Sequence, residues 1–276
     1  MRIVFLVNRD IESNYILNLL LPELHRHTVG IFLSERVGTS SVVRAQMLGQ
    51  LAFIEQDLFR ELVFPLIERI SPGNGRYAGF DELSRRFGIP LQVLLTLKDP
   101  AALQQLLDTR ADLFISIRFG LILDARVLGI PPRGILNLHS GLLPQYRGVL
   151  ATFRALLNGD DEIGCTLHWI DSPSIDKGDV IDRARRPVVK DRSLFWHVLS
   201  LYPLGADLIM SAIRRLESGE SVVGEPQDET AGAYYSFPSE DDLKRFTAQG
   251  WRLFDRGDIW EILEPYGCKP GAALKS

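Results

Sequence analysis

Two polar side chains lie two positions apart in one apolar segment, Asn137 and His139 in GILNLH. If this segment is a strand, both side chains point to the same face, because successive residues of a strand alternate. The sequence SGLLP at 140–144 then breaks the strand. Ligands of open parallel sheets bind at the carboxyl ends of strands. The pair is therefore a candidate active site; the alternative is that Asn137 caps the loop and His139 is merely buried.

An acidic loop at 171–179, DSPSIDKGD, is the second candidate. It follows an apolar segment at 164–170 that is typical of a strand, so it also begins at a strand's carboxyl end. Asp176 or Asp179 could approach His139 and raise its basicity through their charge. Taken alone, such a loop is more often an ordinary solvated turn.

Metal binding is not expected. The chain has five histidines, and no two of them have the i, i+4 spacing of a helical metal site. Its two cysteines, Cys165 and Cys268, match neither a metal motif nor a disulfide framework. A reducing compartment suits such a sequence.

Alternating strands and helices must position these residues. Apolar runs predict strands at 2–7, 29–33, 91–95, 112–117, 134–139, 164–170 and 180–189. Helical spacing predicts helices at 12–24, 80–87, 100–107, 151–157 and 194–216, with Asp99 capping the third of them. Such alternation favours an α/β fold, a mostly parallel sheet with helices on both faces.

Two regions depart from the alternation. Residues 36–80 interrupt it with a long amphipathic helix over 51–66 that Pro65 should disturb, followed by a loop at 71–79. Beyond Gly219 the pattern weakens, and residues 220–276 are expected to form a small, partly ordered C-terminal appendage. The chain of 276 residues thus suits one large domain, or one domain with an appendage.

Charge and hydropathy restrict the partners. The net charge is −4, and residues 225–276 carry 6 Lys or Arg against 10 Asp or Glu. A nucleic-acid partner is disfavoured, because phosphate binding requires a basic face or tail. No stretch approaches the ~18 apolar residues of a membrane span. The first apolar run is too short for a signal peptide, so a cytoplasmic protein is expected.

The two candidate segments together resemble a known family. NLHSGLLPQYRG at 137–148, followed by Asp176-Lys177-Gly178, is similar to the signature of the folate-dependent formyltransferases: Asn-x-His, a Leu-Leu-Pro loop ending in Arg-Gly, and a later Asp-x-Gly. The family includes enzymes that act on methionyl-tRNA, glycinamide ribonucleotide and amino sugars. The resemblance covers about residues 2–219 and is closest over 114–181. Residues 226–229 with Tyr234 or Tyr235 also resemble the linker that follows the catalytic domain of the tRNA enzymes.

The resemblance implies a Rossmann-like catalytic domain over 1–219, with a helical insertion at about 36–80, and an extension over 220–276. It implies that 10-formyltetrahydrofolate is the donor, that no metal takes part, and that Asn137, His139 and Asp176 are catalytic. An amine would attack the formyl carbon. Asn137 and a protonated His139 would stabilise the oxyanion, and His139 would carry the proton. Asp176 would orient the imidazole or relay the proton through water.

The resemblance also implies binding residues. Those expected to hold the folate are Arg118, Phe119, Gly120, Leu121, Gly141, Leu142, Leu143, Pro144, Asp171 and Ile175. Tyr146, Arg147 and Trp169 suit an acceptor with a phosphate and a ring, although Arg147 could equally pair with a nearby acid. The family usually has Ser at the position of Gly141, which removes one expected hydroxyl contact. The insertion is expected to frame the acceptor site or a homodimer face.

The acceptor is the open question. The tRNA enzymes carry a generally basic C-terminal domain, whereas the extension here is acidic. A small-molecule amine is therefore expected, with a nucleotide-linked amino sugar favoured and N-hydroxyornithine of siderophore assembly as a competitor. Methionyl-tRNA remains an alternative. Two further alternatives are a formyl-folate hydrolase and a module that binds folate or a nucleotide without catalysis.

Overall fold

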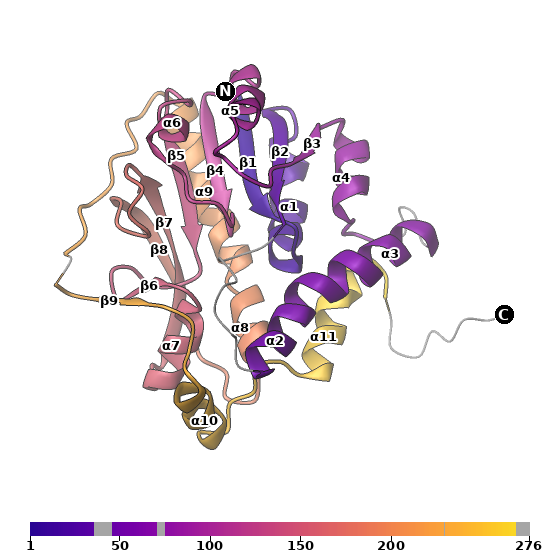
Figure 1. The fold of residues 1–276 in the computed structure, drawn as a ribbon, viewed down its shortest axis with the longest axis vertical. Helices are drawn as coiled ribbons and strands as arrows, with labels where there is room; N and C mark the ends of the chain where they lie inside the picture. Colours follow the sequence, from indigo (N-terminus) through magenta and orange to yellow (C-terminus); the bar gives the residue numbers. More distant parts are fainter. Residues whose placement is uncertain (36–45, 71–74, 229, 269–276) are drawn as a thin grey trace.

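A twisted sheet of seven strands forms the centre of the computed structural model, which describes residues 1–35, 46–70, 75–228 and 230–268 (Figure 1). The order is β3-β2-β1-β4-β5-β7-β8. The strands are β1 (Ile3–Asn8), β2 (Thr28–Ser34), β3 (Leu91–Val93), β4 (Leu113–Ile117), β5 (Ile135–His139), β7 (Glu162–Ile170) and β8 (Val180–Pro187). The first five strands in this order are parallel to one another. β7 runs antiparallel to its neighbours β5 and β8. The predicted mostly parallel sheet is confirmed.

Helices cover both faces of the sheet (Figure 1). Along β1, Ile3, Phe5 and Val7 enter the larger core with residues of α1 (Ile11–Leu24) and α9 (Tyr202–Glu217). Val4 and Leu6 enter a second core with residues of α5 (Pro100–Asp108) and α6 (Ala125–Leu128). This alternation is the one that strand geometry requires. Asp99 caps α5, as predicted, by accepting a hydrogen bond from Ala101 N–H.

The prediction of one continuous helix over 194–216 is wrong, because the structure has two helices there. The structure has α8 (Leu194–Leu199) and α9, separated at Ser200–Leu201. Pro203 explains the break, because proline lacks an N–H and its ring clashes with the carbonyl four residues earlier. Among the described residues, Leu194–Glu217 meets the length and composition of a membrane span, which the sequence did not predict. Of an apolar window of 18 residues within that stretch, 56% is buried inside the molecule, as in a core helix.

The insertion is helical from residue 46 onward. It consists of α2 (Gln46–Ala52), a π-helical stretch (Phe53–Val63) and α3 (Phe64–Ile70), and α4 (Phe80–Phe87) follows. Pro65 was expected to disturb the helix, and the irregular part is the π-helical stretch before it. The wider π-helix leaves room for the proline ring. Residues 36–45 of the insertion and 71–74 of the predicted loop lie outside the described residues.

The extension shares the main core. It contains β9 (Ala233–Tyr235), α10 (Glu240–Ala248), α11 (Arg256–Leu263) and a 3-10 turn (Glu264–Tyr266). Phe246 stacks on Phe153 of α7 (Ala151–Asn158), with ring centroids 4.4 Å apart. The Tyr266 hydroxyl donates a 2.6 Å hydrogen bond to Asn14 of α1. Figure 1 shows α11 beside α2 and α3. The described residues of the extension, 220–228 and 230–268, therefore pack on the sheet domain.

Candidate active site

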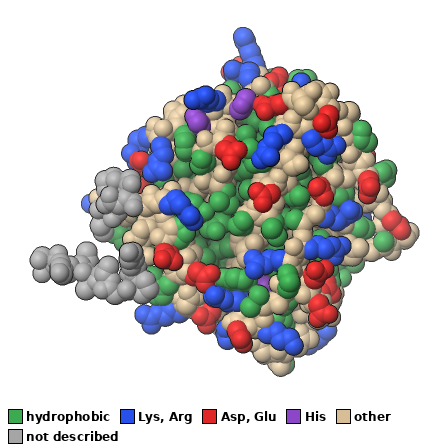
Figure 2. Space-filling view, turned by 180° about the vertical axis from the view of Figure 1, so that it is seen from behind, with side chains coloured by type: hydrophobic (Ala, Val, Ile, Leu, Met, Phe, Trp, Pro, Cys, Tyr) green, Lys and Arg blue, Asp and Glu red, His purple; other side chains and the backbone are tan. Residues whose placement is uncertain are grey.

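A cavity of about 520 Å³ lies at the carboxyl ends of β4 and β5. Ser116, Asn137 and His139 reach it from these strands, and His168 reaches it from β7. The volume falls within the range usual for small-molecule sites. Figure 2 shows one face of the molecule, on which hydrophobic side chains gather in the middle and charged side chains surround them.

The three predicted catalytic residues meet in this cavity. His139 Nδ1 lies 3.6 Å from Asp176 Oδ2. Asn137 is linked to Asp176 through a second histidine, His168. Asn137 Nδ2 lies 3.0 Å from His168 Nε2, and His168 Nε2 lies 3.6 Å from Asp176 Oδ1. The site is thus a group of four side chains in which the Asp176 carboxylate lies between two imidazoles.

Backbone carbonyls determine which ring nitrogens carry hydrogen. His168 Nδ1 lies 2.8 Å from the Trp169 carbonyl and must donate to it. In the neutral ring, Nε2 is then an acceptor, and Asn137 Nδ2 donates to it. Because an amide nitrogen has two N–H bonds, one of Asn137 remains for a ligand. His139 Nε2 donates to the Tyr146 carbonyl at 2.7 Å, so Nδ1 is the atom that can accept a proton.

Asp176 is ionised under all ordinary conditions. Burial opposes ionisation of this carboxyl, but the His139 and His168 side chains that face it and the Gly148 N–H outweigh burial and lower its pKa to about 2. Gly148 N–H donates to Oδ2 at 2.8 Å. Asp176 has a φ of 55°, the left-handed region that is uncommon for residues other than glycine. Such strain is concentrated at functional sites.

Two glycines allow the chain to approach closely here. A Cβ at residue 178 would overlap the Trp169 carbonyl, which explains the glycine of Asp-x-Gly. A Cβ at residue 141 would overlap that of Ala151 and lie 2.8 Å from His139 Nε2. Gly141 therefore fits its surroundings here, and a serine side chain would displace the His139 ring.

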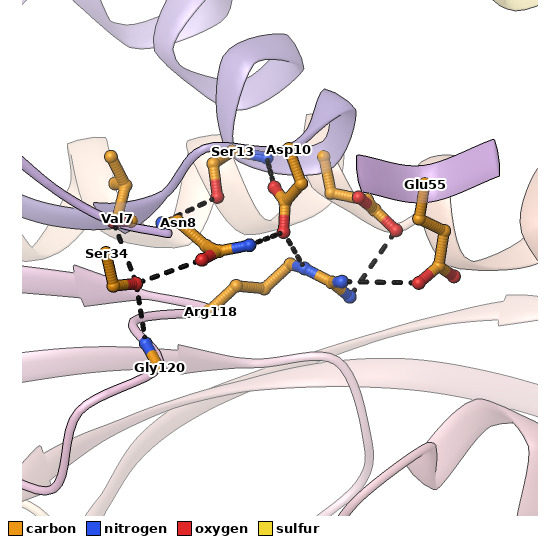
Figure 3. A network of polar contacts seen from close by, with 9 residues as sticks. Val7, Asn8, Asp10, Ser13, Ser34, Glu55, Arg118 and Gly120 are labelled. Carbon is orange, nitrogen blue, oxygen red and sulfur yellow. Dashed lines mark hydrogen bonds and ion pairs between the residues drawn. The ribbon is translucent and has the colours of Figure 1, made fainter. Parts of the chain in front are cut away.

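Arg118 is held by acids of its own chain. Its guanidinium forms ion pairs with Asp10 at 2.9 Å and with Glu12 and Glu55 at 3.4 Å each (Figure 3). All three acids are buried. Burial raises the pKa of Glu12 and of Glu55, and the charge of Arg118 opposes that increase. Although Arg118 lines the cavity, its charge is already balanced.

The network continues into the segment predicted to hold folate. Asp10 accepts from Asn8 Nδ2 at 2.8 Å, Asn8 accepts from the Ser34 hydroxyl at 3.0 Å, and that hydroxyl accepts from Gly120 N–H at 2.8 Å (Figure 3). Phe119, Gly120 and Leu121 line the cavity behind this network. These hydrogen bonds and ion pairs join three segments into one wall: the end of β1, the insertion and residues 118–121.

The other predicted binding residues divide into two groups. Ile175 and Trp169 line the cavity. Residues away from its wall are Gly141, Leu142, Leu143, Pro144, Asp171, Tyr146 and Arg147. Tyr146 donates a 2.7 Å hydrogen bond to Asp160, which uses its hydroxyl hydrogen, and Arg147 is 7% exposed with one guanidinium nitrogen 3.4 Å from the Gly232 carbonyl.

Sequence reasoning missed His168, Glu55 and Tyr234 as parts of this cavity. His168 had a signal, since it is polar in a strand that is otherwise apolar. Its meaning depends on the antiparallel register that pairs it with Asn137. Glu55 lies in the insertion, and Tyr234 in β9 pairs with Arg147 of the short strand β6 (Tyr146–Gly148). These are contacts between distant parts of the chain.

Comparisons with known proteins agree with the motif. Residues 91–195 match the family described as "Formyl transferase". Methionyl-tRNA formyltransferase of Roseiflexus sp. (strain RS-1) is 34% identical over 157 residues, 57% of this chain and 48% of that protein. The enzyme of the same name from Methylobacillus flagellatus is 36% identical over 152 residues, 55% of this chain and 49% of that protein. The chain spans about half the length of these curated relatives.

Solved structures share the fold. Glycinamide ribonucleotide transformylase 1 of Symbiobacterium toebii aligns with a TM-score of 0.55 and 19% identity, covering 83% of this chain and 95% of that one. An N-formyltransferase of Helicobacter canadensis aligns with a TM-score of 0.54 and 17% identity, covering 88% and 72%. The Rossmann-like fold is confirmed. So is the predicted resemblance to the folate-dependent formyltransferases: the segment that matches the formyl transferase family, residues 91–195, contains Asn137, His139 and Asp176.

Proposed function

We propose that this protein transfers the formyl group of 10-formyltetrahydrofolate to the amino group of a small molecule. One observation carries the proposal: Asn137, His139, His168 and Asp176, all in the segment that matches the formyl transferase family, line one cavity. The sequence relatives named methionyl-tRNA formyltransferase support the reaction type. A protein that only binds folate has no need of this arrangement of proton-transfer groups.

The cavity suits a folate in size and character. Its wall at 119–123 and Ile175 is largely apolar, while the polar side chains gather at the strand ends. A few convergent polar groups on an apolar wall are typical of sites for cofactors. Phe119, Leu121 and Ile175 would hold the pterin, and the bound donor supplies a formyl carbon to the polar end. Among the described residues, no group of three or more His, Cys, Asp or Glu is arranged to hold a metal ion.

The chain's own groups fit the chemistry of amine acylation. The free N–H of Asn137 is a donor for an oxygen on which negative charge develops. His139 Nδ1 accepts the proton that leaves the amine, and the Asp176 carboxylate stabilises the imidazolium that forms. The imidazolium returns this proton to the leaving folate nitrogen when the bond from that nitrogen to the formyl carbon breaks. His168 holds the Asn137 amide in the orientation that points its nitrogen toward the ligand side.

A nucleotide-linked amino sugar is the acceptor that we favour. Tyr234 lines the cavity with 54% of its surface exposed and offers a ring face to a flat ligand. Trp169 lines the same cavity, and its indole N–H is bonded to the Val222 carbonyl. The Helicobacter canadensis structure contains folinic acid and dTDP-3-aminofucose. N-hydroxyornithine is the competing small amine, and the cavity also suits it in size.

Methionyl-tRNA is the second candidate, favoured by the names of the sequence relatives. The charge balance opposes it, because 10 acidic residues outnumber 6 basic ones over 225–276. We also propose a cytoplasmic location, which the two free cysteines support.

The test is release of tetrahydrofolate from 10-formyltetrahydrofolate with each of several acceptors: nucleotide-linked amino sugars, N-hydroxyornithine, methionyl-tRNA and none. Asn137→Ala should abolish release that depends on an amine. Asn158→Ala is the matched control, because Asn158 is exposed and donates only to Tyr146. Release without any amine would indicate a hydrolase. No release with any acceptor would contradict the proposal.

A further inference from the structure

The start of the extension runs beside the loop that carries Asp176. Val180 and Glu225 exchange two backbone hydrogen bonds of 2.8 and 2.7 Å. The Trp169 indole N–H donates to the Val222 carbonyl at 3.0 Å. A Cβ at residue 224 would lie 2.9 Å from backbone atoms of Asp179, so the two segments are in close contact. The extension therefore adds a short strand-like segment at the edge of the active site.

Gln227 makes the contact that bears on the chemistry. Its Nε2 donates to the Asp176 carbonyl at 2.9 Å and to the Gly178 carbonyl at 2.7 Å. Both amide hydrogens are thus used on the Asp-x-Gly turn. Asp176 has a left-handed backbone conformation that is disfavoured for a residue with a Cβ, so external contacts must hold it there.

The extension also reaches the carboxylate from the other side. Tyr235 of β9 accepts from Val149 N–H at 2.8 Å, next to Gly148. Gly148, with φ of 94°, donates its own N–H to Asp176 Oδ2. The Asp176 backbone and carboxylate are therefore each held by a contact that depends on residues after 219.

We propose that Gln227 is a positioning residue for the reaction: its amide holds the Asp176–Gly178 turn so that the carboxylate stays between His139 and His168. This inference rests on the proposed function, because it assigns Gln227 an effect on turnover through Asp176. Gln227 does not touch the cavity.

Gln227→Met removes both donors and keeps the length of the side chain. A displaced catalytic group costs on the order of 100-fold in rate, so kcat should fall by roughly 10- to 100-fold while the affinity for 5-formyltetrahydrofolate stays unchanged. Gln249→Met is the control: Gln249 donates one hydrogen bond, to Leu157, and does not line the cavity. A kcat of Gln227→Met equal to that of the control would overturn the inference.

A double variant tests whether the effect passes through Asp176. In an Asp176→Asn background, Gln227→Met should lower kcat no further, because residues that act as one unit are not additive. The same fold loss in both backgrounds would show that Gln227 acts on stability or on another group, and would refute the positioning role.

Hydrogen exchange separates this inference from the proposed function. The Gly148 amide is bonded to the Asp176 carboxylate, so Gln227→Met should speed its exchange at least several-fold relative to Gln249→Met. If wild-type protein transfers no formyl group but Gly148 exchange responds, the proposed function fails and the positioning stands. If the protein is active and neither exchange nor kcat responds, the positioning fails alone.

Discussion

Asp176→Asn should destabilise the folded protein in a manner that depends on pH. The pKa of Asp176 is lowered from 3.8 to about 2 in the folded state. At about 1.4 kcal/mol for each pKa unit, this difference corresponds to about 2–3 kcal/mol of folding stability at pH 7. Asparagine resembles the protonated carboxyl in shape and tolerates the left-handed conformation, so the substitution removes chiefly the charge.

The sign follows from the direction of the shift. A carboxyl whose pKa is lower in the folded state stabilises it at pH values above 3.8, and this stabilisation is lost as the pH falls through about 2. The stability gap between wild type and Asp176→Asn should be full at pH 7 and pH 5. It should shrink to about half at pH 3, where a large part of the unfolded-state carboxyl is already protonated.

Urea unfolding followed by circular dichroism at pH 7, 5 and 3 measures the gap directly. Asp191→Asn controls for the general loss of one negative charge, because Asp191 is exposed and lies outside the cavity. Equal stability of wild type and Asp176→Asn at pH 7 would refute the electrostatic reasoning. A gap of the same size at pH 7 and pH 3 would refute it as well.

Three further predictions concern residues around the site. Gly141→Ala should destabilise the fold by about 1–3 kcal/mol in urea unfolding and lower kcat, because the new Cβ displaces His139. Gly49→Ala is its control: the space around that Cβ is open, so this variant should be neutral or more stable by up to ~1 kcal/mol. Tyr146→Phe should cost about 1 kcal/mol of stability through the lost hydrogen bond and leave the KM of the acceptor unchanged; a higher KM would restore Tyr146 as a substrate contact. Arg118→Met should destabilise by about 3–5 kcal/mol, because buried carboxylates lose their cation. That loss should shrink as the pH falls, since carboxyls with raised pKa values take up protons.

That Asn137 and His139 lie together was predictable because their positions follow from local geometry. Asn137 and His139 share a strand face, and that strand ends next to them. Asp176 was expected nearby because its loop follows a strand's carboxyl end, but that strand, β7, runs antiparallel to β5, so its end lies beside the start of β5. The loop comes close to the pair because β7 places His168 opposite Asn137, a register that the sequence does not show. The order of the main strands and helices was predictable from their periodicity, apart from the break before Pro203.

Residues whose roles depend on distant partners could not be predicted. Arg118 pairs with acids at positions 10, 12 and 55, and only the folded chain shows that its charge is balanced. Tyr146 and Arg147 lie in a short strand paired with β9, so neither reaches the cavity wall. Gln227 acts across a gap of about fifty residues, a distance at which no sequence periodicity connects two positions.

The two departures from the alternating pattern both contribute to the site. Glu55 and Gln56 of the insertion line the cavity, which supports the expectation that the insertion frames a binding site. Tyr234 and Phe237 of the extension line it from the other side. The insertion and the extension therefore form much of the cavity wall around Asn137, His139 and Asp176. We expect this part of the wall to contact the acceptor.

The most direct test of the central claim follows the formyl group itself. The protein is mixed with 10-formyltetrahydrofolate that carries ¹³C in the formyl carbon, together with each acceptor amine, and the products are analysed by mass spectrometry. We predict that wild-type protein and Asn158→Ala add one labelled formyl group to one class of amine, and that His139→Ala and Asn137→Ala do not. Label that remains on the folate or appears only as free formate, with every amine tested, would contradict formyl transfer by this site.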